Sequence, residues 1–226
     1  MTIKFEHIGR APKLVDYRIA WEMQRRVHDE VAKGVTGPTV FLLEHAAVYT
    51  AGRTTEPGDL PVDGTPVIDV DRGGKLTWHG PGQLVGYPIA RLLDMKGIRE
   101  YVSILEEALI NVALGFGIPA IRIKGRSGVW VAGTDGEQDR KLAAIGIRVD
   151  HGVTMHGFAL NCSNDLGPYS RIIPCGITDA GVTSISEETG ITVTPADVLN
   201  RVEQELDALL SPIVSMTSTI PEGVNS

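Results

Sequence analysis

The chain contains little cysteine, only Cys162 and Cys175 among its 226 residues. Two cysteines cannot build a disulfide framework, and in a reducing compartment both are expected to remain thiols. No stretch approaches the roughly 18 consecutive apolar residues that span a membrane, and the first residues lack the apolar run of a signal peptide. We therefore expect a cytoplasmic protein that has no membrane partner.

Positive charge is also scarce, because 21 Lys and Arg residues face 28 Asp and Glu residues and leave a formal net charge of -7. This balance argues against general nucleic-acid binding, although it does not exclude a local basic patch. The patterns Cys-x-x-Cys and His-Glu-x-x-His are absent, which argues against a zinc site. The dinucleotide fingerprint, the P-loop and the Gly-x-Ser-x-Gly motif are absent too, so neither those phosphate sites nor a Ser-His-Asp hydrolase is supported.

Hydrophobic periodicity predicts a mixture of helices and strands. The composition, 42% hydrophobic and 22% charged, is ordinary for a globular protein. These elements do not alternate regularly, and no linker or repeat interrupts them. We therefore expect one α/β (α+β) domain over residues 1–226, with a mixed β-sheet flanked by helices and a polar tail over 212–226. The predicted helices span 14–31, 98–116 and 195–210, and the predicted strands 39–43, 47–50, 67–70, 76–78, 84–89, 121–123, 128–132, 142–149 and 153–161.

Two helices carry specific end signals. Apolar residues from Ile98 to Phe116 fall on one helical stripe, and Gly117 stands where a glycine often ends a helix. Thr194 is expected to cap the last helix, with Pro195 at its first position.

The stretch 71–83, Asp-Arg-Gly-Gly-Lys-Leu-Thr-Trp-His-Gly-Pro-Gly-Gln, gathers five glycine or proline residues around a short apolar-aromatic strand. Glycines let backbone N–H groups approach a ligand closely. The alternative is a tight hairpin with ordinary turn chemistry, and spacing alone favours that alternative.

Cys175 is the best candidate nucleophile. It lies between Pro174 and Gly176, which fix the backbone and clear space beside the sulfur. A buried structural cysteine is the commoner case, and Cys162, next to Asn161 at a strand end, fits it. A reactive cysteine needs a nearby cation or a helix N-terminus that favours its thiolate.

Lys141 is the candidate partner for that thiol, because it opens an apolar strand. A lysine in this position is usually a solvated strand-end charge. If it points inward, burial lets it exchange protons near neutrality, and its ammonium would stabilise a thiolate. Lys141 and Cys175 would then form an acyl-transfer dyad.

Four histidines compete for the role of base. They are more simply interpreted as walls of a site or as surface residues, and these residues are His45, His79, His151 and His156.

At this point the ordered motifs resemble a known family, the octanoyl-acyl carrier protein:protein N-octanoyltransferases, also called lipoyl(octanoyl) transferases. Any one block is weak, but the ordered set spans most of the chain and is highly specific. The matching blocks are Leu43-Glu44-His45, Val48-Tyr49-Thr50, Gly52-Arg53, Arg72-Gly73-Gly74, Thr77, His79-Gly80-Pro81-Gly82-Gln83, Gly128-Val129-Trp130-Val131, residues 141–149, His156-Gly157-Phe158-Ala159-Leu160-Asn161 and Pro174-Cys175-Gly176-Ile177.

The resemblance implies a fold like that of the biotin and lipoate protein ligases, and a Cys–Lys dyad that falls on Cys175 and Lys141. It implies transfer of an octanoyl group from octanoyl-acyl carrier protein, through a Cys175 thioester, to a lysine ε-amine. The acceptors would be lipoyl domains of 2-oxoacid dehydrogenase complexes and the glycine cleavage H protein. Because thioester to amide is downhill, neither ATP nor a metal would be needed as cofactor.

The resemblance also implies an acyl pocket made of three segments. Glycines and small apolar residues in them would form a narrow tunnel for an alkyl chain. The pocket residues are Arg72, Gly73, Gly74, Lys75, Leu76, Thr77, Trp78, His79, Ala144, Ile145, Gly146, Gly157, Phe158 and Ala159.

Three expectations accompany this interpretation. The loop 133–140 carries no specific family signal. Acidic carrier proteins would need a local positive face, so several of eight basic residues are expected at the mouth of the site. The basic residues are Arg53, Arg72, Lys75, Arg122, Lys124, Arg126, Arg148 and Arg171.

The alternative functions are an ATP-dependent lipoate or biotin ligase and a non-catalytic acyl-binding module.

Overall fold

The computed structural model describes residues 2–61, 65–94, 97–172 and 180–216. Cys175 and residues 217–226 of the predicted tail therefore lie outside the described residues.

Within those residues, the chain is organised around a mixed central sheet. β1 runs parallel to β2, and the short β11 (Gly181–Val182) runs parallel to the start of β9, whereas the other neighbours are antiparallel. The mixed sheet predicted from the sequence is thus confirmed. The strand order is β1 (Lys4–Gly9), β2 (Thr39–Leu43), β6 (Gln83–Ile89), β10 (Val153–Asn161), β9 (Arg140–Asp150), β8 (Arg126–Val131) and β7 (Ala120–Ile123).

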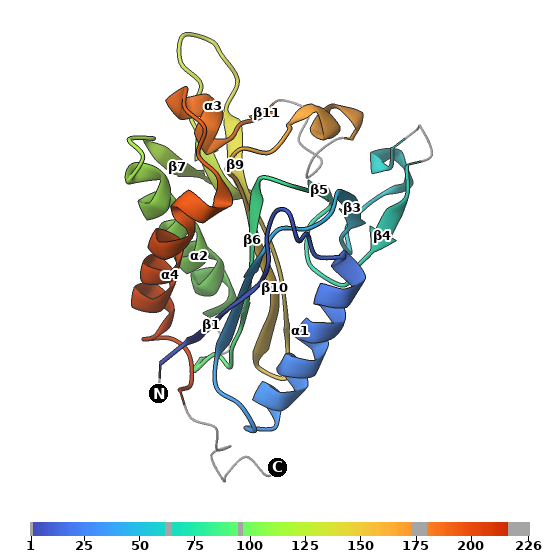
Figure 1. The fold of residues 1–226 in the computed structure, drawn as a ribbon, viewed down its shortest axis with the longest axis vertical. Coiled ribbons are helices and arrows are strands. Elements are labelled where there is room, and N and C mark those ends of the chain that lie inside the picture. The colour runs from blue at the N-terminus through green and yellow to red at the C-terminus, as the bar shows by residue number, and fades with distance from the viewer. Residues whose placement is uncertain (1, 62–64, 95–96, 173–179, 217–226) are drawn as a thin grey trace.

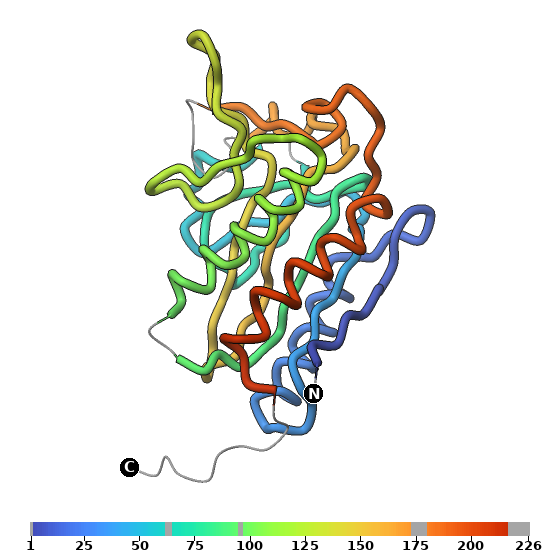
Figure 2. Tube along the Cα trace, turned by 90° about the vertical axis from the view of Figure 1, so that its left-hand side faces the viewer, coloured from blue at the N-terminus to red at the C-terminus, as the bar shows by residue number. Residues whose placement is uncertain are grey.

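Helices cover both faces of this sheet (Figure 1). α1 (Tyr17–Ala32) packs on one face, and α2 (Ile98–Leu114) and α4 (Pro195–Leu210) pack on the other, as Figure 2 shows from their side. In β2, Phe41 and Leu43 belong to the core under α1, and Val40 and Leu42 belong to the core under α2 and α4. A strand between two apolar layers is hydrophobic at every position, which explains the continuous apolar run over 39–43.

The predicted bounds are confirmed for α4, whereas α1 begins at Tyr17 rather than at residue 14 and α2 ends at Leu114 rather than at residue 116. The Thr194 N–H donates to Asp197 Oδ2 at 2.8 Å in a capping box, and α4 has the predicted bounds. Gly117 has φ +77° beyond the end of α2, where the Ile118 N–H bonds to the Ala113 carbonyl. The placement of Ile98 on the buried stripe is wrong, because it is 40% exposed in the first turn of α2.

A smaller sheet of three strands stands beside the central one. β3 (Val48–Ala51) lies between β4 (Val67–Asp69) and β5 (Leu76–His79). β4 and β5 therefore do not pair with each other, and the stretch 71–83 is not the tight hairpin that spacing alone favours. Instead, its loop reaches the central sheet, where the Gly73 N–H bonds to the Ile147 carbonyl of β9 at 2.9 Å.

The sequence pattern misses three elements, β1, the two-residue strand β11 and α3 (Ile185–Thr189). β1 is a half-buried edge strand whose Lys4, Glu6 and His7 obscure the apolar alternation. α3 has five residues, too few to show a helical period. Two short 3₁₀ turns, Pro57–Asp59 and Gly167–Arg171, lie in regions predicted as irregular.

Candidate active site

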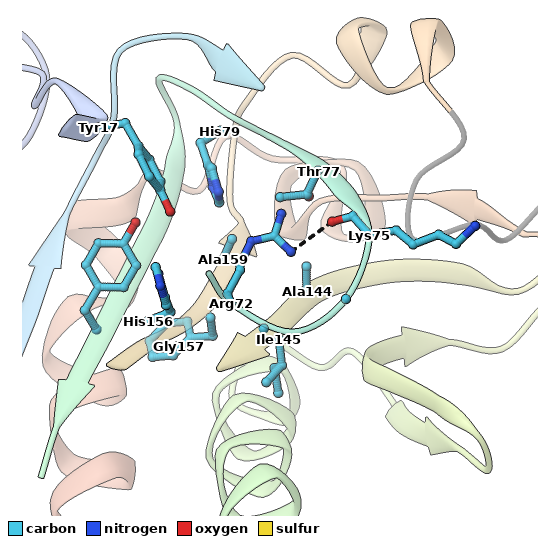
Figure 3. A pocket seen from close by; sticks show the side chains of 14 residues that line it. Tyr17, Arg72, Lys75, Thr77, His79, Ala144, Ile145, His156, Gly157 and Ala159 are labelled. Carbon is cyan, nitrogen blue, oxygen red and sulfur yellow. Dashed lines mark hydrogen bonds between the residues drawn. The ribbon is translucent and has the colours of Figure 1, made fainter. Parts of the chain in front are cut away.

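A narrow cavity lies between the two sheets, with about 450 Å³ of free space including its open mouth (Figure 3). The structure brings together the three segments that the sequence predicts to meet: the loop before β5 with β5 itself, the middle of β9 and the middle of β10. The lining residues are Tyr17, Arg72, Gly74, Lys75, Thr77, His79, Tyr87, Ala144, Ile145, Gly146, His156, Gly157, Phe158 and Ala159.

Three of the predicted pocket residues do not line this cavity. Thr77 and His79 face it, so Leu76 and Trp78 point to the other side of β5, where they join the apolar cluster of Tyr49 and Tyr169. This is the two-residue alternation of a strand. Gly73 also stays outside the lining, because its backbone is engaged with β9.

Arg72 holds the cavity wall together. Its Nη2 donates to the Thr50 carbonyl at 2.8 Å and to Thr50 Oγ1 at 3.0 Å, and its Nη1 donates to the Gly73 and Lys75 carbonyls at 3.0 and 2.9 Å. A Cβ at Gly146 would meet Arg72 Cδ at 3.0 Å. The glycine therefore makes room for the guanidinium, which is 7% exposed.

His79 is fixed as a neutral imidazole in one tautomer. Gln83 donates through Nε2 to Asn161 Oδ1 at 2.9 Å, so its Oε1 accepts the His79 Nδ1–H, also at 2.9 Å. His79 Nε2 is thereby left as an acceptor, with Thr50 Oγ1 at 3.4 Å. Burial holds the pKa of His79 well below its ordinary value, which agrees with a neutral ring.

Two tyrosines that the sequence analysis does not single out close the α1 side of the cavity. The hydroxyls of Tyr17 and Tyr87 share a hydrogen bond, and Tyr87 donates to His45 Nε2 at 2.7 Å. Burial raises the pKa of Tyr17 to about 12 and lowers that of His45 to about 4. Their only sequence signal is position, because Tyr17 opens the first helix and Tyr87 lies in the strand after the glycine-rich stretch.

His156 has the most unusual backbone among the lining residues. Its φ is +58°, a conformation that non-glycine residues rarely adopt. Its Nε2 donates to Asp71 Oδ1 at 2.7 Å, and Arg148 pairs with the other carboxylate oxygen. The hydrogen bond from His156 holds the pKa of Asp71 well below its usual range. The Nδ1 of His156 is buried and has no hydrogen-bond partner among the described residues.

Lys141 points inward rather than into solvent, as the dyad interpretation requires. Its side chain is 6% exposed, and its Nζ lies 4.5 Å from the centre of the Trp130 ring. It precedes Ala144 by three residues in β9, roughly 10 Å along the strand. Its predicted partner Cys175 lies outside the described residues, so their pairing stays a prediction.

The remaining candidates separate clearly. Cys162 is fully buried in the main core, and burial raises the pKa of its thiol to about 12, so its interpretation as a structural cysteine is confirmed. His151 is exposed and lies away from the cavity.

Of the eight basic residues expected near the mouth, Arg72 and Lys75 line the cavity. Figure 3 shows the Lys75 amine pointing away from it, where Asp59 accepts at 3.0 Å.

The sequence has clear relatives. It matches the model of the lipoyl protein ligase A/B catalytic domain over residues 16–207. It is 55% identical to an octanoyltransferase of Paenarthrobacter aurescens over 223 residues, which cover 99% of both chains. It is 60% identical to an octanoyltransferase of Salinispora arenicola over 196 residues, 87% of this chain and 92% of that relative. The chain belongs to the octanoyltransferase family.

This octanoyltransferase-family chain has the fold of the lipoate and biotin protein ligases, as predicted. It superposes on lipoate-protein ligase A bound with ATP with a TM-score of 0.67 and 14% identity, over 98% of this chain and 89% of the other. Against the biotin protein ligase of Leishmania major, the TM-score is 0.51 at 13% identity, over 94% and 76% of the two chains. Identities this low establish the fold alone.

Two kinds of feature are absent from the part of this family member that the structure describes. No helix there has the length and apolar character to cross a membrane. No group of three His, Cys, Asp or Glu side chains there could hold a metal ion, although His45, His79 and His156 lie near one another.

Proposed function

We propose that this protein transfers an octanoyl group from octanoyl-acyl carrier protein to a lysine ε-amine of lipoyl domains, through a thioester on Cys175. One observation carries the proposal: in a chain of the octanoyltransferase family, three glycine-rich segments form a narrow cavity that begins three residues along β9 from the buried Lys141. The reaction would be the first step of endogenous protein lipoylation.

The cavity suits a saturated chain along one wall. Ala144, Gly146, Gly157 and Ala159 present backbone and methyl groups from neighbouring strands. Each buried CH₂ contributes about 0.8 kcal/mol, so a chain held there gains several kcal/mol. The wall therefore provides binding energy without any charged recognition of the acyl group.

In the first step, Lys141 acts as the general base that takes the proton of the Cys175 thiol, and the sulfur attacks the thioester carbonyl. The tetrahedral intermediate collapses, the bond to the carrier sulfur breaks, and Lys141 returns the proton to the departing carrier thiolate. In the second step, the acceptor amine attacks the Cys175 thioester. The amide bond forms, the C–S bond breaks, and the proton lost by the amine passes through Lys141 to Cys175.

The proposed partners follow from this chemistry. The donor is octanoyl-acyl carrier protein, and the acceptors are lipoyl domains of 2-oxoacid dehydrogenase complexes and the glycine cleavage H protein. A thioester is already activated towards an amine, so the proposal includes neither ATP nor a metal. We place the reaction in the cytoplasm and assign it to one domain over the chain.

Intact-mass measurement after mixing with octanoyl-acyl carrier protein tests the proposal. We expect a hydroxylamine-labile octanoyl adduct on the wild type, none on Cys175→Ala, and slow formation on Lys141→Ala. Transfer that proceeds without an adduct and depends on ATP would assign the protein to the ligases instead. A protein that shows neither adduct nor transfer would be an acyl-binding module.

A further inference from the structure

The position of the Lys141 side chain depends on the Trp130 ring and on the backbone of β9. Trp130 faces it across the β8–β9 pair and contacts its ammonium. The indole is itself fixed, because its Nε1 donates to the Arg126 carbonyl at 3.1 Å. A cation over an indole face is attracted to it but can still slide and rotate. The direction of the Lys141 side chain therefore depends on the backbone that carries it.

That backbone is irregular at this point. Val129 pairs with Ala143, whereas the next residue, Trp130, pairs with Lys141, so Leu142 is an extra residue in β9. Such a bulge redirects the neighbouring side chains. Opposite it, Gly128 has φ +120°, and a Cβ there would meet the Ala143 carbonyl at 2.5 Å and Lys141 Cε at 3.4 Å. Gly128 thus allows β8 to lie against the lysine.

One buried carboxylate fixes Gly128. Glu106 of α2 is 7% exposed, and its Oε1 accepts the Gly128 N–H at 3.0 Å. Its other oxygen lies 3.2 Å from Arg122 Nε. The next residue, Glu107, also binds Arg122, with Oε2 2.5 Å from Nη2, but its side chain is 43% exposed and the Gly128 N–H bonds to Glu106 instead. The two glutamates share one arginine and differ in their contact with β8.

We infer that Glu106 is a positioning residue for Lys141. Its carboxylate anchors the Gly128 N–H, this anchor sustains the β8–β9 bulge, and the bulge directs the Lys141 Nζ along the Trp130 face towards the cavity end of β9. The inference rests on the proposed catalytic role of Lys141, but the position of the Nζ can be measured without that role.

The test compares Glu106→Ala, Glu106→Gln and Glu107→Ala with Lys141→Ala and the wild type. Octanoyl transfer gives kcat and KM, and acetylation by N-hydroxysulfosuccinimide acetate, followed by peptide mass spectrometry, gives the reactivity of Lys141 relative to the exposed Lys33. Glu106→Leu, which fills the volume without an acceptor, replaces Glu106→Ala if the alanine variant does not fold.

We expect kcat of Glu106→Ala to fall about 10- to 100-fold with KM unchanged, since a small displacement of a catalytic group has effects of this size. Lys141 should be acetylated several-fold faster in this variant. Glu106→Gln keeps an oxygen acceptor and should stay within about threefold of wild type, and Glu107→Ala should match wild type. Where Lys141→Ala is itself impaired, an equal loss in Glu106→Ala and Glu106→Gln, or no loss in either, would overturn the inference.

The same measurements distinguish failure of the proposed function from failure of this inference. Full activity of Lys141→Ala would remove the catalytic role of Lys141, yet faster Lys141 acetylation in Glu106→Ala would still support the positioning contact. Unchanged acetylation in Glu106→Ala would reject the contact whatever the activity of Lys141→Ala.

Discussion

Two buried cations lie at different points along β9, with Arg72 packed against Gly146 from a loop and Lys141 in the strand itself, and they are held in opposite ways. Both are nearly excluded from solvent, with exposures of 7% and 6%. Arg72 donates four hydrogen bonds to oxygens of Thr50, Gly73 and Lys75. Within the described part of the chain, the Lys141 Nζ has the Trp130 ring as its contact and no carboxylate. One cation is fixed by four directed hydrogen bonds, and the other is held against an aromatic face.

The difference follows from the chemistry of the two side chains. A guanidinium stays protonated in proteins and matches several acceptors at once, so it suits a permanent cross-link between loop and strand. An ammonium over an indole is stabilised more weakly, by about 0.5–2 kcal/mol, and is not held in one orientation. The four hydrogen bonds give Arg72 a structural role, whereas the acid–base role of Lys141 stays a proposal.

Lys141→Arg should produce the largest effect, because it keeps the charge and removes the proton exchange. We expect kcat for octanoyl transfer to fall by about 10²- to 10⁴-fold, the usual contribution of a positioned acid–base group. Steady-state kinetics with octanoyl-acyl carrier protein measures this. If Lys141→Arg retained octanoyl transfer, a positive charge alone would suffice at position 141, and Lys141 would not differ from Arg72 in this respect.

Arg72→Ala should have the next largest effect, on stability. Removing the guanidinium leaves buried carbonyls unsatisfied, and we expect the free energy of unfolding to fall by about 4 kcal/mol. Urea unfolding measures it, with Arg53→Ala, an exposed neighbour in the family motif, as the matched control. A loss no greater than that of Arg53→Ala would show that the Arg72 hydrogen bonds are dispensable.

The elements that the sequence predicts well are those with one dominant signal. The strand 39–43 is apolar on both faces, and the last helix has a capping box and a proline at its start, so both have the predicted bounds. Convergence of the three glycine-rich segments follows from the family resemblance, and the structure brings them together. That these segments bind an acyl chain stays a prediction.

The residues that the sequence could not place depend on tertiary geometry. The side of β5 that faces the cavity depends on its pairing with β3, so Leu76 and Trp78 are included in the pocket prediction although they point away. Tyr17 is missed because the sequence does not distinguish a tyrosine that opens a helix and faces a cavity from one that faces solvent. The support of Lys141 by Glu106 joins α2 to β8 through one backbone N–H, and side-chain types alone do not reveal it.

Acidification should disturb the Arg72 region through its histidines. The folded-state pKa of His45 is lowered to about 4 by burial, against about 6.5 when unfolded. Between these values the unfolded chain binds more protons, so the free energy of unfolding falls as the pH falls. For His45 alone the loss reaches about 3 kcal/mol by pH 4.

Urea unfolding at pH 7, 5.5 and 4 measures this dependence. His45→Gln should be less stable at pH 7 but show a shallower decline, because the titrating ring is gone. His151→Gln changes an exposed histidine and should keep the slope of the wild type. Equal slopes in all three proteins would mean that His45 does not stay neutral by burial.

Gly146→Ala should give the smallest effect and locate the boundary between the two regions. Its new methyl group would approach Arg72 Cδ at 3.0 Å and the Gly73 carbonyl at 3.1 Å, and the four hydrogen bonds of Arg72 prevent that side chain from yielding. The methyl group therefore takes space from the cavity, and we expect KM for the octanoyl donor to rise a few-fold, about 1 kcal/mol. The kcat should not change, because Lys141 lies five residues away in β9, on the other side of the bulge. Gly37→Ala is the control, since a Cβ there meets nothing within 4 Å. A fall in kcat with KM unchanged would mean that a change beside Arg72 reaches Lys141 through β9, so that the two cations act as one unit.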